Sequence, residues 1–431
     1  MRILALPVLA GVFSCTLIAA AVAQENLPLR EQVKDITPAA HWIYDDLPKA
    51  QAEAKQTGKP LLVVLRCVPC PPGKTLDGQV MNPSPELEAL EKKFVCVRVI
   101  QTKGLDLQLF TYDYDMSWAA MFLTADGAVL GRYGTRNSTG PGSDNLLSVS
   151  GFRKAAERAL AVHANYPANK AELAGKLAKS ADYARPEETP GLTDRKGVET
   201  TRRNCIHCHM VREFALRAKW EEGQLSKSDL FVFPMPQRAG LTLDIDDGLV
   251  VKEVAADSAA AAAGIAAGDE LVSISGQPLI STADVQWALH IAPVEATLPV
   301  TLKRAGKSFE KQLKLSGDWK ESDIGWRASS WYGLRQGVKF DPLPAAEREK
   351  FGLAADQLGL VIKGLYGKGG PKLQQAGFKV GDVIVAVDGK NDALTESQFL
   401  AKLRLNYGPK DTVKLTVQRG NQRQDISVLA W

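Results

Sequence analysis

Apolar residues in the first third of the chain follow alternating helix-like and strand-like patterns. The helix-like stretches place apolar positions on one face, and the strand-like runs are almost continuously apolar, which is typical of strands buried within a sheet. Two of these runs flank Asp126-Gly127, a dipeptide that favours a tight hairpin. The pattern predicts helices over residues 47–58 and 86–93 and strands over residues 60–66, 94–100, 119–123 and 129–133.

The middle of the chain carries a helical pattern without strands. Residues 151–163 and 169–183 place Ala and Leu on one face and are predicted as helices. Asn169 is a suitable N-cap for the second of them. The polar residues 186–191 contain two prolines and predict a linker, so we place a domain boundary there.

The last part of the chain contains an internal repeat. Residues 248–252 match residues 359–363, and residues 263–269 match residues 376–382. In each copy the motif A-G-x-x-x-G-D precedes an alternating strand that ends at a glycine turn. We therefore expect two copies of one small domain.

Length, charge and the first residues set the broad class of protein. A chain of 431 residues is too long for one core and predicts about three or four domains. The net charge of +4 is small and Lys and Arg are not clustered, so no nucleic-acid partner is expected. Residues 1–23 combine Arg2, an apolar run and the small-x-small site Ala21-Val22-Ala23, which predicts a cleaved secretory signal peptide. An uncleaved membrane anchor is the alternative. We expect an exported, periplasmic or extracytoplasmic protein with no membrane span after cleavage.

Five cysteines follow the predicted signal: two C-x-x-C pairs and Cys96. Cys205, Cys208 and His209 have the C-x-x-C-H spacing of covalent haem c attachment, in which both thiols bond the porphyrin and the histidine is the proximal iron ligand. Met235, in a proline-rich loop, is the best sixth ligand of the iron, with core packing as its alternative role. For the C-x-x-C pair itself, a zinc site and a plain disulfide are the alternatives.

The other pair, Cys67 and Cys70, ends a predicted strand that begins after Lys59-Pro60. With the terminal Asp-Gly hairpin, these features resemble a thioredoxin-fold domain over residues 41–136. The resemblance implies that Cys67 is an exposed, activated thiol and that Cys70 resolves mixed disulfides. A structural disulfide, a metal site or an electron relay is the alternative.

Two features depart from the thioredoxin pattern. Residues 71–73 are Pro-Pro-Gly, so a long helix cannot start directly at the first thiol. Residues 116–118 lack the cis-proline that faces the dithiol in thioredoxins. Cys96 lies among alternating apolar residues of a strand and is expected to be buried and inert.

The repeated motif resembles PDZ domains of bacterial exported proteins, over residues 237–316 and 324–431. The resemblance implies a groove between a strand and a helix, in which the C-terminal tail of a partner protein adds to the strand edge. The groove helices would be residues 281–290 and 395–405. The loops that would bind the terminal carboxylate contain Gly240, Leu241 and Thr242 in the first copy and Gly333 and Leu334 in the second. Packing of these modules with a closed groove is the alternative. The chain shows no serine-protease nucleophile elbow.

These features predict a multidomain protein of α/β and α+β parts. The expected order is a signal peptide (1–23), a thioredoxin-like domain (41–136), a helical connector (150–185), a C-x-x-C-H segment (199–236) and two PDZ domains (237–316 and 324–431). This order resembles the bacterial exported thioredoxin-like/PDZ proteins, some of which are selenoproteins.

The favoured function is that of an exported redox protein, in which the Cys67/Cys70 dithiol and a covalent haem serve thiol or electron transfer with a partner held by the PDZ domains. One alternative is a non-catalytic PDZ scaffold with structural disulfides. The other is a thiol–disulfide oxidoreductase without haem.

Overall fold

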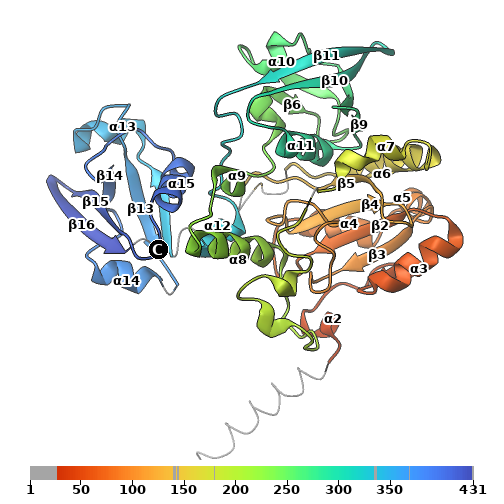
Figure 1. Cartoon of the computed structure of the whole chain (residues 1–431), viewed down its shortest axis with the longest axis horizontal. Coiled ribbons are helices and arrows are strands. Elements are labelled where there is room, and N and C mark those ends of the chain that lie inside the picture. The colour runs from red at the N-terminus through yellow and green to blue at the C-terminus, as the bar shows by residue number, and fades with distance from the viewer. Residues whose placement is uncertain are drawn as a thin grey trace, which may run out of the picture.

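The computed structural model describes residues 27–138, 142, 145–178, 180–333, 337–367 and 369–429 (Figure 1). The expected signal peptide, residues 1–23, lies outside these ranges and stays a prediction. Every helix in the described ranges is too short or too polar to span a bilayer.

The thioredoxin-like domain is built on a five-stranded sheet in the order β1-β3-β2-β4-β5. Strands β1, β3 and β2 are parallel, β4 runs antiparallel to β2, and β5 pairs antiparallel with β4 and so has the direction of the first three. Each apolar run predicted as a strand is one. The three inner strands are apolar on both sides because a strand in the middle of such a sheet must bury both faces. The strands are β1 (Trp42–Tyr44), β2 (Leu61–Arg66), β3 (Val95–Val99), β4 (Trp118–Leu123) and β5 (Val129–Tyr133).

Two apolar cores cover the two faces of this sheet. One contains side chains of α4 (Lys74–Met81), α5 (Pro85–Glu91) and α6 (Val149–Ala164). The other contains side chains of α3 (Leu47–Thr57), of the loop before β4, and Cys208 from much later in the chain. The second face of the sheet is therefore completed by the C-x-x-C-H segment.

Two predictions about helix ends have different outcomes. Helix α4 begins only at Lys74, after the Pro-Pro-Gly stretch, as expected. The predicted helix over residues 169–183 is wrong: α7 (Lys170–Leu173) continues only as a 3-10 turn, Ala174–Lys176. The carbonyl of Gly175 accepts a hydrogen bond from Trp287 Nε1 at 2.9 Å, so a tertiary contact uses an acceptor that a longer helix would need.

The C-x-x-C-H segment continues into two helices. Helix α8 (Cys208–Glu221) starts at the second cysteine, and α9 (Lys227–Leu230) follows it. Helix α8 packs against α12 (Ala328–Gly333), which lies in the connection between the PDZ domains.

The two PDZ domains share the architecture that the repeat predicts. The first pairs β11-β10-β8-β9 in one sheet and β6-β7 in another, and the second pairs β12 to β16 in sequence order. The groove helices α11 (Thr282–Ile291) and α15 (Glu396–Asn406) lie where they were predicted. The strands are β6 (Leu241–Leu243), β7 (Val251–Val254), β8 (Glu270–Ile274), β9 (Gln277–Pro278), β10 (Ala296–Arg304), β11 (Lys307–Leu315), β12 (Val338–Pro342), β13 (Leu360–Leu365), β14 (Val383–Val387), β15 (Thr412–Arg419) and β16 (Gln422–Leu429). The remaining helices are α10 (Ala259–Ala262), α13 (Ala345–Arg348) and α14 (Gly369–Gln375).

The aspartate of the repeated motif has the same role in both copies. Asp269 is fully buried and pairs with Arg304 Nε at 2.6 Å, and Asp382 pairs with Arg419 Nε at 2.7 Å. Each carboxylate also accepts the backbone N–H three residues before it. The motif therefore needs Asp because one carboxylate closes the turn and anchors the end of a distant strand.

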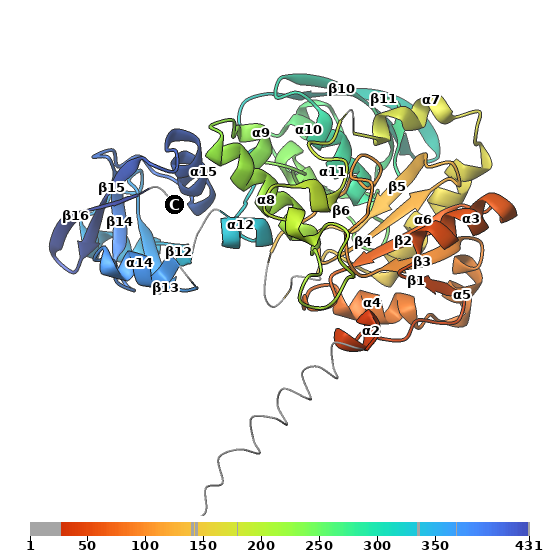
Figure 2. The ribbon, with the colours of Figure 1, turned by 60° about the horizontal axis from the view of Figure 1, so that its bottom comes forward.

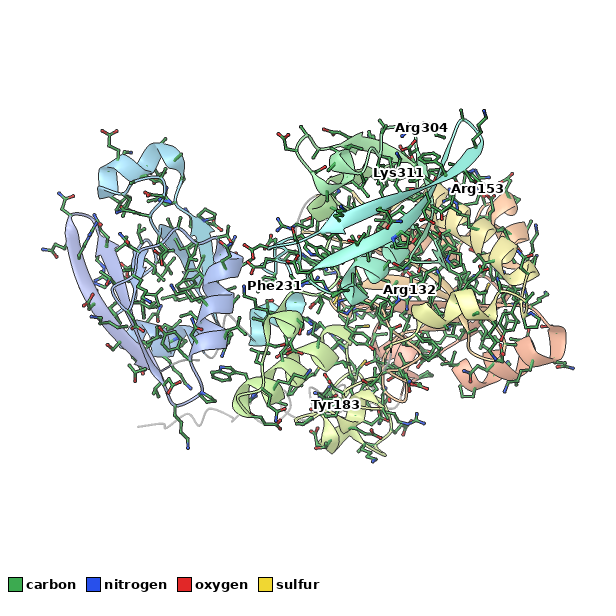
Figure 3. The ribbon with its side chains drawn as sticks, turned by 45° about the horizontal axis from the view of Figure 1, so that its top comes forward. Arg132, Arg153, Tyr183, Phe231, Arg304 and Lys311 are labelled. Atoms are coloured by element: carbon green, nitrogen blue, oxygen red, sulfur yellow. The ribbon has the colours of Figure 1, made fainter. Side chains whose placement is uncertain are left out.

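The first PDZ domain is docked on the thioredoxin-like domain (Figures 1 and 3). Asp284 of α11 is buried and pairs with Lys176 Nζ at 2.7 Å, and it lies 3.5 Å from Arg132 of β5. Gly131 is part of this contact, since a Cβ there would come within 2.3 Å of Ile280. The second PDZ domain stands to one side, with α15 facing α8 and α9 (Figure 2).

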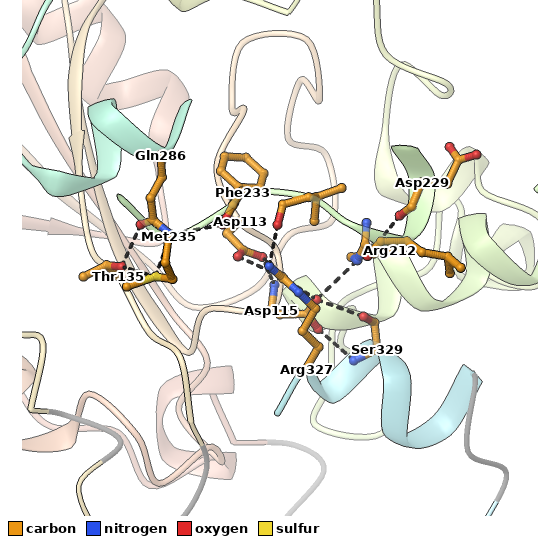
Figure 4. A network of polar contacts seen from close by, with 12 residues as sticks. Asp113, Asp115, Thr135, Arg212, Asp229, Phe233, Met235, Gln286, Arg327 and Ser329 are labelled. Atoms are coloured by element: carbon orange, nitrogen blue, oxygen red, sulfur yellow. Dashed lines mark hydrogen bonds and ion pairs between the residues drawn. The ribbon is translucent and has the colours of Figure 1, made fainter. Parts of the chain in front are cut away.

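A buried charge cluster joins the three parts of the chain that meet at α8 (Figure 4). Arg327, before α12, donates to Asp113 at 2.7 and 2.8 Å and to Asp115 at 3.2 Å. Asp115 also accepts from the backbone and hydroxyl of Ser329, at 2.7 and 2.9 Å, and lies 3.3 Å from Arg212 Nε of α8. This cluster holds α8 and the connection between the PDZ domains on the thioredoxin-like domain.

Replacing Arg327 with Met should destabilise the protein by about 3–5 kcal/mol, because it leaves two buried carboxylates without their main partner. The matched control is Arg217→Met on α8, which removes an exposed pair with Glu221. The control should cost only about 0.3–0.5 kcal/mol. Urea titration followed by tryptophan fluorescence measures both, and equal shifts of the unfolding midpoint would contradict the role of the cluster.

Candidate functional site

The Cys67–Cys70 turn follows directly after β2 and is held by backbone contacts. Cys70 N–H donates to the carbonyl of Cys67 at 3.0 Å, and Cys67 N–H donates to the carbonyl of Ser117 at 2.9 Å. The buried Arg66 donates to the carbonyls of Cys70, Pro72 and Ser117 at 2.8, 2.9 and 2.8 Å. One guanidinium therefore fixes both the dithiol turn and the strand that faces it.

The C-x-x-C-H segment lies across this turn. The carbonyl of Ile206 accepts from the backbone N–H and the hydroxyl of Thr102, at 3.0 and 2.9 Å. His207 Nδ1 lies 3.4 Å from Cys67 Sγ. Tyr112 donates its hydroxyl to Cys208 Sγ at 3.0 Å. The structure therefore brings the two C-x-x-C pairs, which are 135 positions apart in sequence when counted from Cys70 to Cys205, to one site.

Burial reverses the expected exposure of the first pair. Cys67 is only 4% exposed, because His207 and the segment around it cover the sulfur, whereas Cys70 is half-buried. The prediction that Cys67 is the exposed thiol is wrong. Cys205 and Cys208 are each 6% exposed, and Cys96 is buried as predicted.

The two thiols of the first pair have opposite pKa shifts. Hydrogen-bond donation from Cys67, with the positive potential of His209 and Arg66, lowers the pKa of Cys70 to about 6. The same hydrogen bond, together with burial, raises the pKa of Cys67 well above its usual value. At neutral pH the thiolate is therefore on Cys70, and Cys67 holds the proton.

The second pair is protonated at neutral pH. Burial raises the pKa of Cys205 to about 12 and that of Cys208 to about 11, although the Tyr112 hydroxyl favours the Cys208 thiolate. Burial also lowers the pKa of His207 to about 4, so its ring is neutral next to Cys67. The sequence pattern gives no role in thiol chemistry to His207 or Tyr112. The position of His207 between the two cysteines of the C-x-x-C-H motif is the one sequence feature that indicates a role near the thiols.

The geometry does not fit a haem bound through this motif. Both sulfurs point into protein, and Cys208 belongs to the core on the second face of the sheet. His209 lies 3.6 Å from Glu213 and stacks on His207. A neighbouring cavity of about 280 Å³ is lined by residues including Tyr112, Val211 and Arg212, and its lining includes neither cysteine of the motif nor His209. A haem would need α8 to leave the sheet.

Met235, the expected sixth ligand, takes part in a different contact. Its sulfur accepts from Gln286 Nε2 at 3.2 Å and lies 3.7 Å from the hydroxyl of Thr135 (Figure 4). It therefore packs between α11 and the end of β5, which matches its alternative role. Within the described residues, no three His, Cys, Asp or Glu side chains are placed to hold a metal ion, so the zinc alternative also lacks support.

The two expected carboxylate-binding loops differ. In the first PDZ domain Gly240 has a φ of +90° and leads into β6, whose Leu241 is buried and Thr242 half-buried. In the second, Gly333 is the last residue of α12 and not part of a loop beside β12, while Leu334 lies outside the described residues. The helix forms there because α12 packs on α8.

Comparison with known proteins supports the domain assignment. Residues 42–125 match the model of a thioredoxin-like family, and residues 237–315 and 367–429 match the model of the PDZ domain. The chain thus combines one thioredoxin-like domain with two PDZ domains.

Curated relatives match parts of the chain. The periplasmic serine endoprotease DegP of Escherichia coli K12 is 30% identical over 206 residues, 47% of this chain and 39% of the relative. A probable DegP-like periplasmic serine endoprotease of Rickettsia conorii is 23% identical over 200 residues, 43% of this chain and 38% of the relative. The serine protease Do-like HtrA of Lactococcus lactis is 34% identical over 107 residues, a quarter of each chain. The chain spans about two fifths of the length of the DegP relatives.

Alkylation of Cys70 by iodoacetamide should be half-maximal near pH 6 and slow below it, because only the thiolate reacts. Cys67→Ala should move this midpoint upward, since it removes the donor that lowers the pKa of Cys70 most. Cys67→Ser keeps a donor and is the matched control. Peptide mass spectrometry at each pH gives the profile, and a midpoint unchanged in Cys67→Ala would contradict the assignment.

Proposed function

We propose that the protein is an exported thiol–disulfide exchange protein, in which Cys70 is the attacking thiolate and the PDZ domains hold the partner. This proposal rests on the difference in burial and pKa between the two thiols. Cys70 is half-buried with a pKa of about 6, and it is hydrogen-bonded to the buried, protonated Cys67. A purely structural pair does not require this asymmetry. Export is supported by the apolar first residues and by the relatives named as periplasmic.

The exchange with a partner disulfide takes two steps. The Cys70 thiolate attacks one partner sulfur, so a Cys70–partner bond forms while the partner's own S–S bond breaks and its other sulfur leaves as a thiolate. Cys67 then gives its proton to the thiolate released from the partner and attacks Cys70 Sγ. The partner gains two electrons, and the Cys67–Cys70 disulfide forms. The same steps in reverse oxidise a partner dithiol.

The PDZ domains supply the binding function in this proposal. A partner tail would add to the edge of β6, with its carboxylate at the backbone N–H groups around Gly240. Seven consecutive residues of α11, 283–289, are buried, so the outer side of this helix is used for docking on the thioredoxin-like domain. Docking at this helix fixes the first PDZ domain at a constant position relative to the dithiol.

Two other functions are less well supported. The haem-based electron transfer expected from the C-x-x-C-H spacing requires a rearrangement of α8, so we derive no step from it. The endoprotease activity in the relatives' names is not extended to this chain, because the shared part is about two fifths of their length.

The mature chain should catalyse reduction of insulin by dithiothreitol, and Cys70→Ser should reduce that rate by about 100-fold or more, to the uncatalysed level, because it removes the attacking sulfur. Cys96→Ser is the matched control and should keep the activity, since Cys96 lies inside β3 away from solvent. Equal rates for wild type and Cys70→Ser would refute the proposed function.

A visible spectrum of protein matured with haem-attachment machinery is the companion measurement. We expect no Soret absorption after denaturation, because Cys205 and Cys208 are enclosed by protein. Persistent absorption would show covalent haem and would replace the thiol proposal with electron transfer.

A further inference from the structure

The C-x-x-C-H segment covers the dithiol where a substrate would bind it. Residues 205–208 are held beside the end of β3 by the two hydrogen bonds from Thr102 to Ile206. His207 covers Cys67, and Cys208 packs in the same core as side chains of β2. The first thiols that a reactive Cys67/Cys70 pair meets are therefore in its own chain.

We propose that Cys205 and Cys208 are a second redox pair, which exchanges its disulfide with Cys67 and Cys70 inside the chain. This inference rests on the proposed thiol chemistry and adds a reaction partner to it. The cluster that binds Arg212 of α8 to Asp115 holds the start of this helix against the sheet, so the two pairs stay together.

The electrons and atoms of the transfer balance within the chain. With Cys205–Cys208 oxidised, the Cys70 thiolate attacks Cys208 Sγ, the Cys70–Cys208 bond forms, and Cys205 leaves as a thiolate. The Cys205 thiolate, whose pKa burial raises to about 12, takes up the proton of Cys67, and Cys67 attacks Cys70 Sγ. A Cys67–Cys70 disulfide forms and Cys208 is released as a thiolate, which accepts a hydrogen bond from Tyr112. Two electrons thus pass from the first pair to the second, and a disulfide or dithiol of an extracytoplasmic protein completes the cycle.

The position of the second pair selects Cys208 as the sulfur that is attacked. Cys208 interacts electrostatically with both Cys67 and Cys70, whereas the charged neighbours of Cys205 are Cys208, Asp45 and Arg195. Cys208 also packs in the core that contains side chains of β2, the strand that leads to Cys67, whereas Cys205 is not part of that core. A mixed disulfide should join Cys70 to Cys208.

Trapping of this mixed disulfide tests the geometry. The full mature chain carrying C67S and C205S keeps Cys70 and Cys208, and diamide followed by non-reducing peptide mass spectrometry should give a Cys70–Cys208 crosslink. The matched variant carrying C67S and C208S keeps Cys70 and Cys205 and should give about tenfold less crosslink, because Cys208 and not Cys205 packs in the core beside β2. Equal yields in the two variants, with far-UV circular dichroism showing both folded, would overturn the proposal.

A second measurement uses the wild-type chain and does not depend on how the variants fold. One equivalent of diamide introduces one disulfide per chain, which should redistribute between the two pairs at a rate independent of protein concentration. A disulfide that stays where it first forms, or that moves at a rate proportional to concentration, overturns the relay. Insulin reduction by wild type and by Cys70→Ser reports on the proposed function separately, so a failed relay leaves that result standing.

Discussion

The arrangement of the thiol site depends on the buried pairing of Arg327 and Arg212 with Asp113 and Asp115. Removing these charges from water is costly, and the cost is offset only where each carboxylate has close, well-directed donors. Asp115 accepts hydrogen bonds from the backbone N–H and the hydroxyl of Ser329, in addition to its contacts with the guanidinium groups. Burial alone would raise the pKa of Asp115, but the two arginines outweigh it and lower that pKa. The carboxylate therefore stays charged, and the cluster keeps its attraction at neutral pH.

The location of this cluster matters as much as its strength. Asp113 and Asp115 lie in the loop that continues to Ser117, whose carbonyl accepts from Cys67 and from Arg66. Arg212 lies one helical turn after Cys208, on the same helix. A single polar cluster thus fixes the loop on one side of the dithiol and the helix on the other. The closeness of the two C-x-x-C pairs follows from this shared support.

The sequence predicts most of the elements but not the meeting of the two dithiols. Apolar runs identify β2 and β3 because a central strand must bury both faces, and the repeated aspartates identify the PDZ domains because each closes one turn. These are local signals. The contact of Arg327 with Asp113 joins residues 214 positions apart, and no periodicity carries information about such a pair. The short α7 has the same cause, since its continuation depends on contacts with α11.

The chemistry of the C-x-x-C-H motif could not be predicted from its sequence either. A C-x-x-C pair occurs both in haem-attachment sites and in redox dithiols at the start of a helix, and only the surroundings separate the two. Here the surroundings are the hydroxyl of Tyr112 on Cys208 and the ring of His207 on Cys67. Both contacts come from folding the segment onto another domain, so the motif alone could not reveal them.

Helix α8 also connects the thiol site to the second PDZ domain. Its first residue is Cys208, and near its other end Trp220 Nε1 donates to the carbonyl of Tyr407 at 2.8 Å while Arg404 of α15 lies over the Trp220 ring. The helix has 14 residues and is about 21 Å long, so it links the two ends through one continuous hydrogen-bonded backbone. A peptide bound to the second PDZ domain could alter the thiol site only if the peptide bound with different free energy to two positions of α8. Contacts at α15 and at Arg212 are therefore the places where such a difference must arise.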